Sequence, residues 1–196
     1  MSNHESLAEL FAYPGGGGRT RVQAALADLD APLQDRLAPF ARFVETTEPA
    51  DLEEAYTRTF DINPVCTLEV GWHLYGEDYS RGSFLVFMRE LLRLHGIEET
   101  PELPDHLTSV LAVLGRLGDD EARDFVRGQV LLAINKMLEG FKSDDDPYRV
   151  VVTVVRDWLR ERYGPEASLP TEMAPSPYGE MCEGCGVVPQ GGDTDG

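Results

Sequence analysis

Histidine and cysteine are the residues through which this chain could do chemistry, and both are scarce. The four histidines are His4, His73, His95 and His106, and they form neither an HExxH motif nor any pair four residues apart. A zinc protease site needs two histidines at that spacing on one helix face. His95 falls on an apolar helix face, which indicates a histidine in or beside the core. There is also no GxSxG elbow, so the sequence contains no complete catalytic constellation.

Cys66 is the next candidate for a nucleophile. A catalytic thiol needs a general base, and no histidine stands close to Cys66 in the sequence. A small buried thiol is therefore the preferred interpretation. Carboxylates number 35, so a pair of them is weak support for acid–base catalysis. We predict that the chain is not an enzyme.

Cys182 and Cys185 form one CxxC motif, the single local pattern with metal-ligand or redox spacing. Two thiolates supply half of the four ligands that structural zinc prefers. Thioredoxin-type CxxC motifs stand beside a βαβ pattern, whereas this one lies in a Gly- and Pro-rich stretch. Cys182 and Cys185 are thus candidate metal ligands. The alternatives are a tail feature without a tight site and a transient contact with a partner.

The charge balance narrows the classes of partner. Lys plus Arg number 17 against 35 Asp plus Glu, for a net charge of −18. Such a surface repels phosphates, which argues against nucleic-acid binding. It attracts basic partners such as an Arg-bearing peptide. Solubility alone is the competing interpretation of the same charge.

The chain shows no signal for export or membrane insertion. No apolar run approaches the roughly 20 residues that cross a bilayer. The first residues lack a basic start followed by a long apolar core. Three cysteines do not suggest a disulfide framework. We expect a cytoplasmic protein with no stable membrane insertion.

Helical periodicity dominates the elements that must position these residues. Apolar side chains recur at three- and four-residue steps in successive segments. Phe84 to His95 is the clearest, and Gly96 stands where a C-cap glycine would. Another apolar stripe predicts a helix from about Pro104 to Leu117. Pro39 interrupts the stripe from Leu33 to Val44, which predicts a kink or a split. We therefore predict an all-α, single-domain helical bundle of about seven to nine helices.

Two later segments do not show a clear helical pattern. The β-branched run from Val150 to Val155 resembles a strand, but Val151, Val154 and Trp158 fit one helix face. We favour helix, because no partner strand is predicted nearby. From Gly164 onward the chain is rich in Gly, Pro and acid. We predict a helical domain over residues 1–163 and a flexible acidic tail over 164–196 that carries the CxxC.

Several segments form an ordered set of motifs along the chain. The segments are Leu10-Phe11-Ala12-Tyr13-Pro14, Tyr56-Thr57-Arg58-Thr59-Phe60-Asp61-Ile62-Asn63-Pro64, Cys66-Thr67-Leu68, His73-Leu74-Tyr75-Gly76, Arg81-Gly82 and Glu102-Leu103-Pro104-Asp105-His106-Leu107. In order and spacing, over roughly residues 5–160, they together resemble the NarJ-type branch of the TorD/DmsD/NarJ assembly chaperones. The ordered set is more specific than any one piece. The stretch Glu69–Gly76 looks closer to chaperones of dimethylsulfide-, ethylbenzene-, selenate- or chlorate-type enzymes than to the nitrate reductase type.

The resemblance implies a TorD-like fold with no catalytic residues and no cofactor of its own. It implies a chaperone that binds the N-terminal segment of the apo catalytic subunit of a molybdopterin enzyme. Such chaperones hold the subunit until molybdenum cofactor and iron–sulfur insertion, before maturation or export. A monomer or a domain-swapped dimer is compatible with it. The alternative hypothesis is a metal- or redox-responsive helical protein that uses the CxxC.

The resemblance and the charge pattern together select candidate peptide-binding residues. An amphipathic peptide helix can lie in a groove while acidic rim residues meet its arginines. The candidates are Tyr56, Phe60, Asp61, Tyr75, Arg81, Glu102, Asp105 and His106.

Four of the candidates have a structural alternative. Tyr56 and Phe60 could fill the core, and Arg81 could form a salt bridge that holds the Asp61 loop. Asp105 could complement a helix dipole. His106 would make binding pH-sensitive if it pairs with a carboxylate.

Overall fold

The computed structural model describes residues 2–167, and no strand is present among them. This part of the chain folds into nine continuous helices, because α4 runs directly into η1, and α8 continues through η2 into α9. The prediction of an all-α bundle is confirmed for these residues. The helical segments are α1 (Asn3–Glu9), α2 (Gly18–Asp28), α3 (Ala31–Thr46), α4 (Pro49–Tyr56), η1 (Thr57–Asp61), α5 (Val70–Tyr75), α6 (Tyr79–Leu94), α7 (Leu107–Leu114), α8 (Asp119–Phe125), η2 (Val126–Val130), α9 (Leu131–Glu139) and α10 (Pro147–Tyr163).

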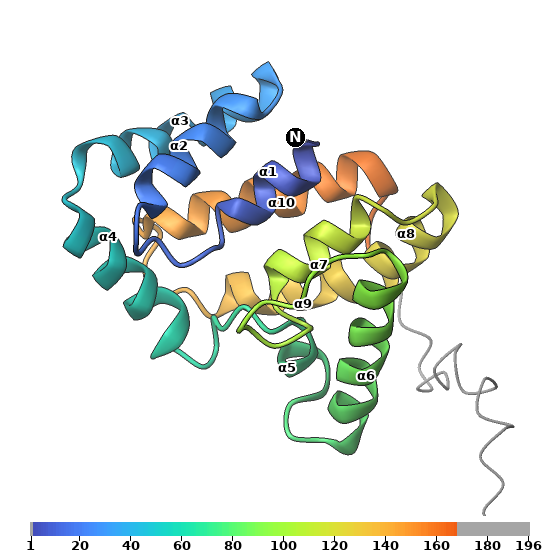
Figure 1. Ribbon diagram of the computed structural model, residues 1–196. Coiled ribbons are helices and arrows are strands. Elements are labelled where there is room, and N and C mark those ends of the chain that lie inside the picture. Colours follow the sequence, from blue (N-terminus) through green and yellow to red (C-terminus); the bar gives the residue numbers. More distant parts are fainter. Residues whose placement is uncertain (1, 168–196) are drawn as a thin grey trace, which may run out of the picture.

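Helix α10 lies at the centre of the arrangement (Figure 1). It packs against α3 on one side and α9 on the other, and α1 packs against α7 and α2. Helix α5 packs against α9 and α6, and α6 also contacts α7. Helix α4 connects the α1–α3 layer to the α5–α9 layer along one edge (Figure 1). Residues from both layers therefore meet where α4 ends.

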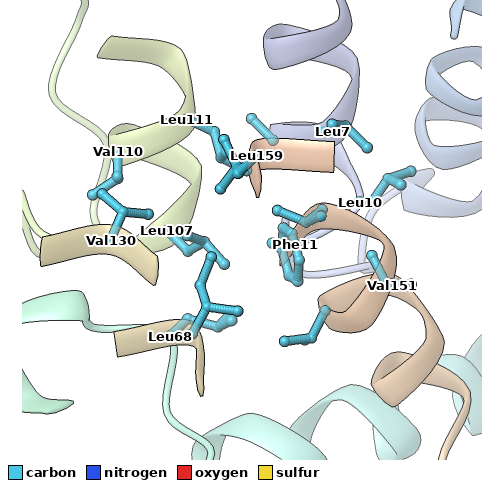
Figure 2. Packing of buried hydrophobic residues seen from close by; sticks show 14 of the residues in the cluster. Leu7, Leu10, Phe11, Leu68, Leu107, Val110, Leu111, Val130, Val151 and Leu159 are labelled. Atoms are coloured by element: carbon cyan, nitrogen blue, oxygen red, sulfur yellow. The ribbon is translucent and has the colours of Figure 1, made fainter. Parts of the chain in front are cut away.

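The core is continuous between the two layers. Leu7 and Phe11, from the first helix and the turn after it, face Val151 and Leu159 of α10 (Figure 2). All four side chains are fully buried. Burial of a Leu, Val or Phe side chain contributes about 1.5–3 kcal/mol each. Helix α1 packs against α7, and its His4 contacts Tyr163 and Trp158 of α10, so the N-terminal segment is part of the scaffold.

Two features predicted from the sequence can be compared with helices α10 and α6. Val150 to Val155 lies within α10, as predicted, and its inward valines are buried. Gly96 has φ +64° and follows the last residues of α6, which confirms the predicted C-cap. Helix α10 ends before Gly164, beyond which the Ala167 amide still donates to the Arg127 carbonyl at 2.9 Å.

Of the kink or split predicted at Pro39, the split is excluded, and the predicted start of α7 is wrong. Helix α3 runs through Pro39 without a split, because Pro39 is exposed and the carbonyl displaced by its ring can turn to water. Helix α7 begins at Leu107 rather than near Pro104. The backbone before Leu107 pairs elsewhere: the Val70 amide donates to the Asp105 carbonyl, and the Leu107 amide to the Leu68 carbonyl, both at 2.9 Å.

That pairing forms an isolated antiparallel bridge between Glu69 and His106. We call the two paired segments, residues 68–71 and 105–107, the joint. The joint pairs the residues at the start of α5 with the residues at the start of α7, and the two segments are more than 30 residues apart in the sequence. None of the helices in residues 2–167 combines the length and apolar character needed to span a membrane.

Candidate functional site

A pocket of about 290 Å³ lies beside the joint, where α4 and η1 approach the lead-in to α7. Its lining residues come from four separate stretches of the chain. They are Tyr13, Tyr56, Phe60, Asp61, Thr67, Leu68, Glu69, Glu102 and His106. Five of the eight predicted peptide-binding residues are in this set: Tyr56, Phe60, Asp61, Glu102 and His106.

Aromatic side chains build one wall of the pocket. The ring of Tyr56 packs edge-to-face against Tyr13 and Phe60, with centroid distances of 5.4 and 5.2 Å. The Tyr56 hydroxyl donates to the Phe11 carbonyl at 3.0 Å. Phe60 is 2% exposed and contacts Tyr148 of α10. Tyr56 and Phe60 therefore belong to the core and present only an edge to the pocket.

Carboxylates line the side of the pocket that faces this aromatic wall. Burial, and then the negative charges of Asp61 and Glu102, raise the pKa of Tyr56. Burial also raises the pKa of Glu69, and the charges of Asp105 and Glu102 act in the same direction. The Thr67 hydroxyl donates to Glu69. Asp61, Glu69 and Glu102 all line the pocket, and the charge of each acts on the phenol of Tyr56, so three acidic side chains surround one small volume.

His106 lines the pocket but does not behave as predicted. Its Nδ1 accepts the backbone N–H of Thr108 at 3.3 Å and lies 2.8 Å from the Thr108 hydroxyl, which makes His106 the N-cap of α7. Burial lowers its pKa to about 4. No carboxylate of residues 2–167 pairs with the ring, so the condition for a His–carboxylate switch is not met. A cap needs an acceptor nitrogen, which favours the neutral ring.

Asp105 lies beneath the pocket rather than in it. It is 0% exposed, and its Oδ2 accepts the Gly71 amide at 2.9 Å. Gly71 is the second residue of α5, so the carboxylate complements the first turn of that helix rather than of α7. A Cβ on Gly71 would lie 2.7 Å from Asp105 Oδ2 and 2.8 Å from a ring carbon of Phe84. Only glycine permits this close approach.

Arg81 and Tyr75 lie on the α5–α6 side of the joint, outside the pocket lining. The guanidinium of Arg81 stacks over Trp72, with 5.3 Å between Cζ and the ring centroid. The expected salt bridge from Arg81 to Asp61 is therefore wrong, because the packing of α5 on α6 directs Arg81 to Trp72. Tyr75 packs against Phe84 at 5.7 Å, and burial raises its pKa.

Four lining residues were missed in the sequence. Tyr13, Thr67 and Leu68 stood in segments that carried the resemblance, but nothing indicated that they approach Tyr56. Glu69 was one of many acidic residues. Its place depends on the joint, which pairs it with His106, and no local pattern predicts a lone antiparallel bridge.

The predictions for Cys66 and for the CxxC motif have different outcomes. Cys66 is 0% exposed, and its thiol donates to the Met137 carbonyl at 3.6 Å. Burial raises its pKa to about 11, so it is a structural thiol, as predicted. Cys182 and Cys185 lie outside the described residues, so their role as metal ligands stays a prediction. Within residues 2–167, no cluster of His, Cys, Asp and Glu could hold a metal ion.

A second cavity, of about 470 Å³, lies toward the far end of α10 and is lined by Trp158 and Leu33. Its charged residues are largely paired, since Arg36 contacts Glu161 at 3.1 Å and Asp157 at 3.4 Å. It therefore has no surplus of one charge and no predicted site residue.

Comparison with known proteins places the chain in a family. A family model described as the nitrate reductase delta subunit matches residues 26–148, which is more than half of the chain. The "Nitrate reductase molybdenum cofactor assembly chaperone NarJ" of Escherichia coli (strain K12) is 32% identical over 123 residues. These residues cover 59% of this chain and 52% of that protein. The protein of the same name from Escherichia coli O157:H7 matches with the same identity and coverage.

The chain thus spans about half the length of the curated relatives it matches. The matched region contains all eight predicted peptide-binding residues, η1 and the joint. The resemblance first drawn from ordered motifs is confirmed, and the chain belongs to the nitrate reductase delta subunit family.

Proposed function

We propose that this protein is a non-enzymatic assembly chaperone for a molybdoenzyme of the nitrate reductase type. It binds the N-terminal segment of the molybdopterin-containing catalytic subunit at the pocket beside the joint. It keeps that subunit competent for molybdenum cofactor and iron–sulfur insertion. Family membership supports the general role, and the acidic, aromatic character of the pocket is the observation that carries the choice of site.

The charges of the pocket favour a basic segment. Among its lining residues in the described chain there is no Lys or Arg, and the pKa of His106, at about 4, keeps that ring neutral near pH 7. Asp61, Glu69 and Glu102 therefore share the pocket without a cationic lining residue, although the charge of Arg81 acts on Glu69 from outside the lining. A guanidinium can bind two carboxylate oxygens at once, which makes Arg the best complement.

The rim of the pocket suits apolar side chains that flank the basic residue in the client segment. Tyr13 is 43% exposed, and Ile62 and Leu103, which follow the lining residues Asp61 and Glu102, are 72% and 43% exposed. Exposed apolar side chains grouped beside a pocket mark binding surfaces more often than isolated ones do. An amphipathic segment would place its basic side chain inside and its apolar side chains on this rim.

The size of the pocket limits what enters it. Sites for small molecules commonly measure about 300–1,000 Å³, and this pocket falls just below that range. It suits one or two side chains, so the rest of the client segment would lie across the rim. The five lining candidates are the proposed contacts, whereas Asp105, Arg81 and Tyr75 support them from the joint and from α5 and α6.

Titration of the full chain with a synthetic N-terminal peptide of a nitrate reductase-type catalytic subunit from the same organism tests the proposal. Glu102→Gln and Asp61→Asn should each weaken binding about three- to tenfold, since each removes one charge-assisted contact. Glu90→Gln, at an exposed position of α6 outside the pocket, is the matched control and should change nothing. Absence of binding to both the peptide and the apo-subunit would refute the chaperone role.

Oligomeric state and cytoplasmic location stay predictions from the sequence. The same holds for a metal- or redox-responsive role of Cys182 and Cys185. Metal analysis of protein purified with and without residues 182–196 would test that role, and equal metal contents would remove it.

A further inference from the structure

The chain leaves α4 through a π-helical turn rather than an ordinary one. This turn, η1, spans Thr57–Asp61, and the Ile62 amide donates to the Thr57 carbonyl five residues earlier, at 3.1 Å. A π turn of this kind is one of the ways in which a helix ends at its C-terminus. Here it begins directly after Tyr56 and ends at Asp61, and both line the pocket.

The π turn changes where Asp61 faces. In an α-helix each residue advances by about 100°, so Asp61 would stand roughly 140° away from Tyr56 around the helix. The wider π turn advances less per residue, which brings Asp61 back toward the side of Tyr56. Accordingly, the Asp61 charge acts on the phenols of both Tyr56 and Tyr13.

The Thr57 hydroxyl holds the Asp61 carboxylate in this direction. Thr57 Oγ1 donates to Asp61 Oδ2 at 3.0 Å. Thr57 is β-branched, so its χ1 angle is restricted and the hydroxyl is already oriented. Asp61 itself is exposed, and without this bond its side chain would sample several rotamers.

Tyr13 connects the same group to α4. Its hydroxyl donates to Glu53 at 3.2 Å. Desolvation, and then the Glu53 hydrogen bond and the charges of Glu53 and Asp61, raise the pKa of Tyr13, whereas the Thr57 hydroxyl lowers it. Thr57 therefore stands between the Tyr13 phenol and the Asp61 carboxylate at the pocket edge.

We propose that Thr57 is a positioning residue of the pocket. The π turn presents its hydroxyl to Asp61, and the hydrogen bond holds the carboxylate where a bound cationic side chain needs it. Binding then costs less side-chain entropy. This inference rests on the proposed function, because it assumes that the pocket receives a basic side chain of the client.

A double-mutant cycle separates this role from simple helix support. The probe is the N-terminal catalytic-subunit peptide used above, titrated into the full chain. Thr57→Val should weaken binding about two- to fivefold, whereas Thr57→Ser, which keeps the hydroxyl, should stay within twofold of the wild type. In an Asp61→Asn background the effect of Thr57→Val should disappear, because the charged acceptor is gone.

Thr46→Val is the matched control. The Thr46 hydroxyl donates to the Arg42 carbonyl at 2.9 Å within α3, outside the pocket lining, so its loss should leave peptide affinity unchanged. Thermal melts of each variant identify any loss of folding, and Thr57→Ala replaces Thr57→Val if the valine is not accommodated.

The outcomes distinguish the two proposals. A wild-type chain that does not bind the peptide contradicts the proposed function. Peptide binding that Asp61→Asn weakens, with a Thr57→Val effect equally large in both backgrounds, overturns the positioning role alone. So does binding that Thr57→Val leaves unchanged.

Discussion

The joint has two faces that use acidic residues in opposite ways. On the closed face, Asp105 is fully buried and its carboxylate accepts the amide of Gly71. On the open face, Glu102 is exposed and lines the pocket with Glu69. Glu102 and Asp105 are three residues apart in one motif, and both were predicted from the sequence to bind the peptide. The difference teaches that motif membership does not separate a residue that contacts a client from one that supports the contact.

Gly71→Ala should produce the largest change, and it acts on the closed face. The new Cβ would meet Asp105 Oδ2 at 2.7 Å and Phe84 at 2.8 Å, and both neighbours are buried. We expect a loss of about 3 kcal/mol or more in the free energy of unfolding, measured by urea denaturation.

Gly82→Ala is the control for that substitution. Gly82 lies in the same bundle on the exposed side of α6, with nothing within 4 Å of a built Cβ. Alanine there should stabilise the protein by about 0.5–1 kcal/mol. Equal effects at the two glycines would contradict the tight packing of the closed face.

His106 belongs to both faces, because it lines the pocket and pairs with Glu69. Its folded-state pKa of about 4 lies below the ordinary value of 6.5, so its contribution to stability is complete above pH 6.5. That contribution is lost as the pH falls through 6.5 toward 4, and the loss amounts to about 3 kcal/mol at pH 4. His106→Asn keeps a capping acceptor and should remove this part of the pH dependence.

The comparison of wild type with His106→Asn isolates this group. His4, whose pKa burial also lowers to about 4, keeps its own loss of stability at low pH in both proteins. Glu69 and Asp105 have raised pKa values, so their contribution has the opposite sign: it is complete at low pH and declines as the pH rises through those values. Identical slopes of unfolding free energy between pH 7 and 4 would contradict a buried, neutral His106.

Asp105→Ala and Glu102→Gln form the pair that compares the faces directly. Asp105→Ala leaves the buried Gly71 amide without its acceptor and should cost about 1–3 kcal/mol in unfolding free energy. Its effect on peptide affinity should stay below that of Glu102→Gln. Glu102→Gln should leave the unfolding free energy within about 0.5 kcal/mol of the wild type. If Asp105→Ala abolishes peptide binding with its stability intact, the assignment of the two faces is reversed.

Helix positions were predictable because they depend on local periodicity. The stripe Phe84–Met88–Leu91–Leu92 of α6 and the valines of α10 are buried on the predicted faces. The start of α7 was not predictable, because the Asp105 and Leu107 backbone groups are used in the joint. The π turn was equally hidden, since Thr57–Asp61 carries no sequence signal for an i→i+5 bond.

The sequence by itself determined the helical class of this protein, its acidic charge and its family, because periodicity, composition and ordered motifs are properties of the linear chain. It also singled out Tyr56, Phe60, Asp61, Glu102 and His106, which line one pocket. Only the tertiary structure decided that Glu69 and Tyr13 join them, and that Asp105 is buried below. The physical reason is that the burial and the charge environment of a side chain depend on which distant segments of the chain meet. Here a single antiparallel bridge, between Glu69 and His106, brings residues 68–71 against residues 105–107.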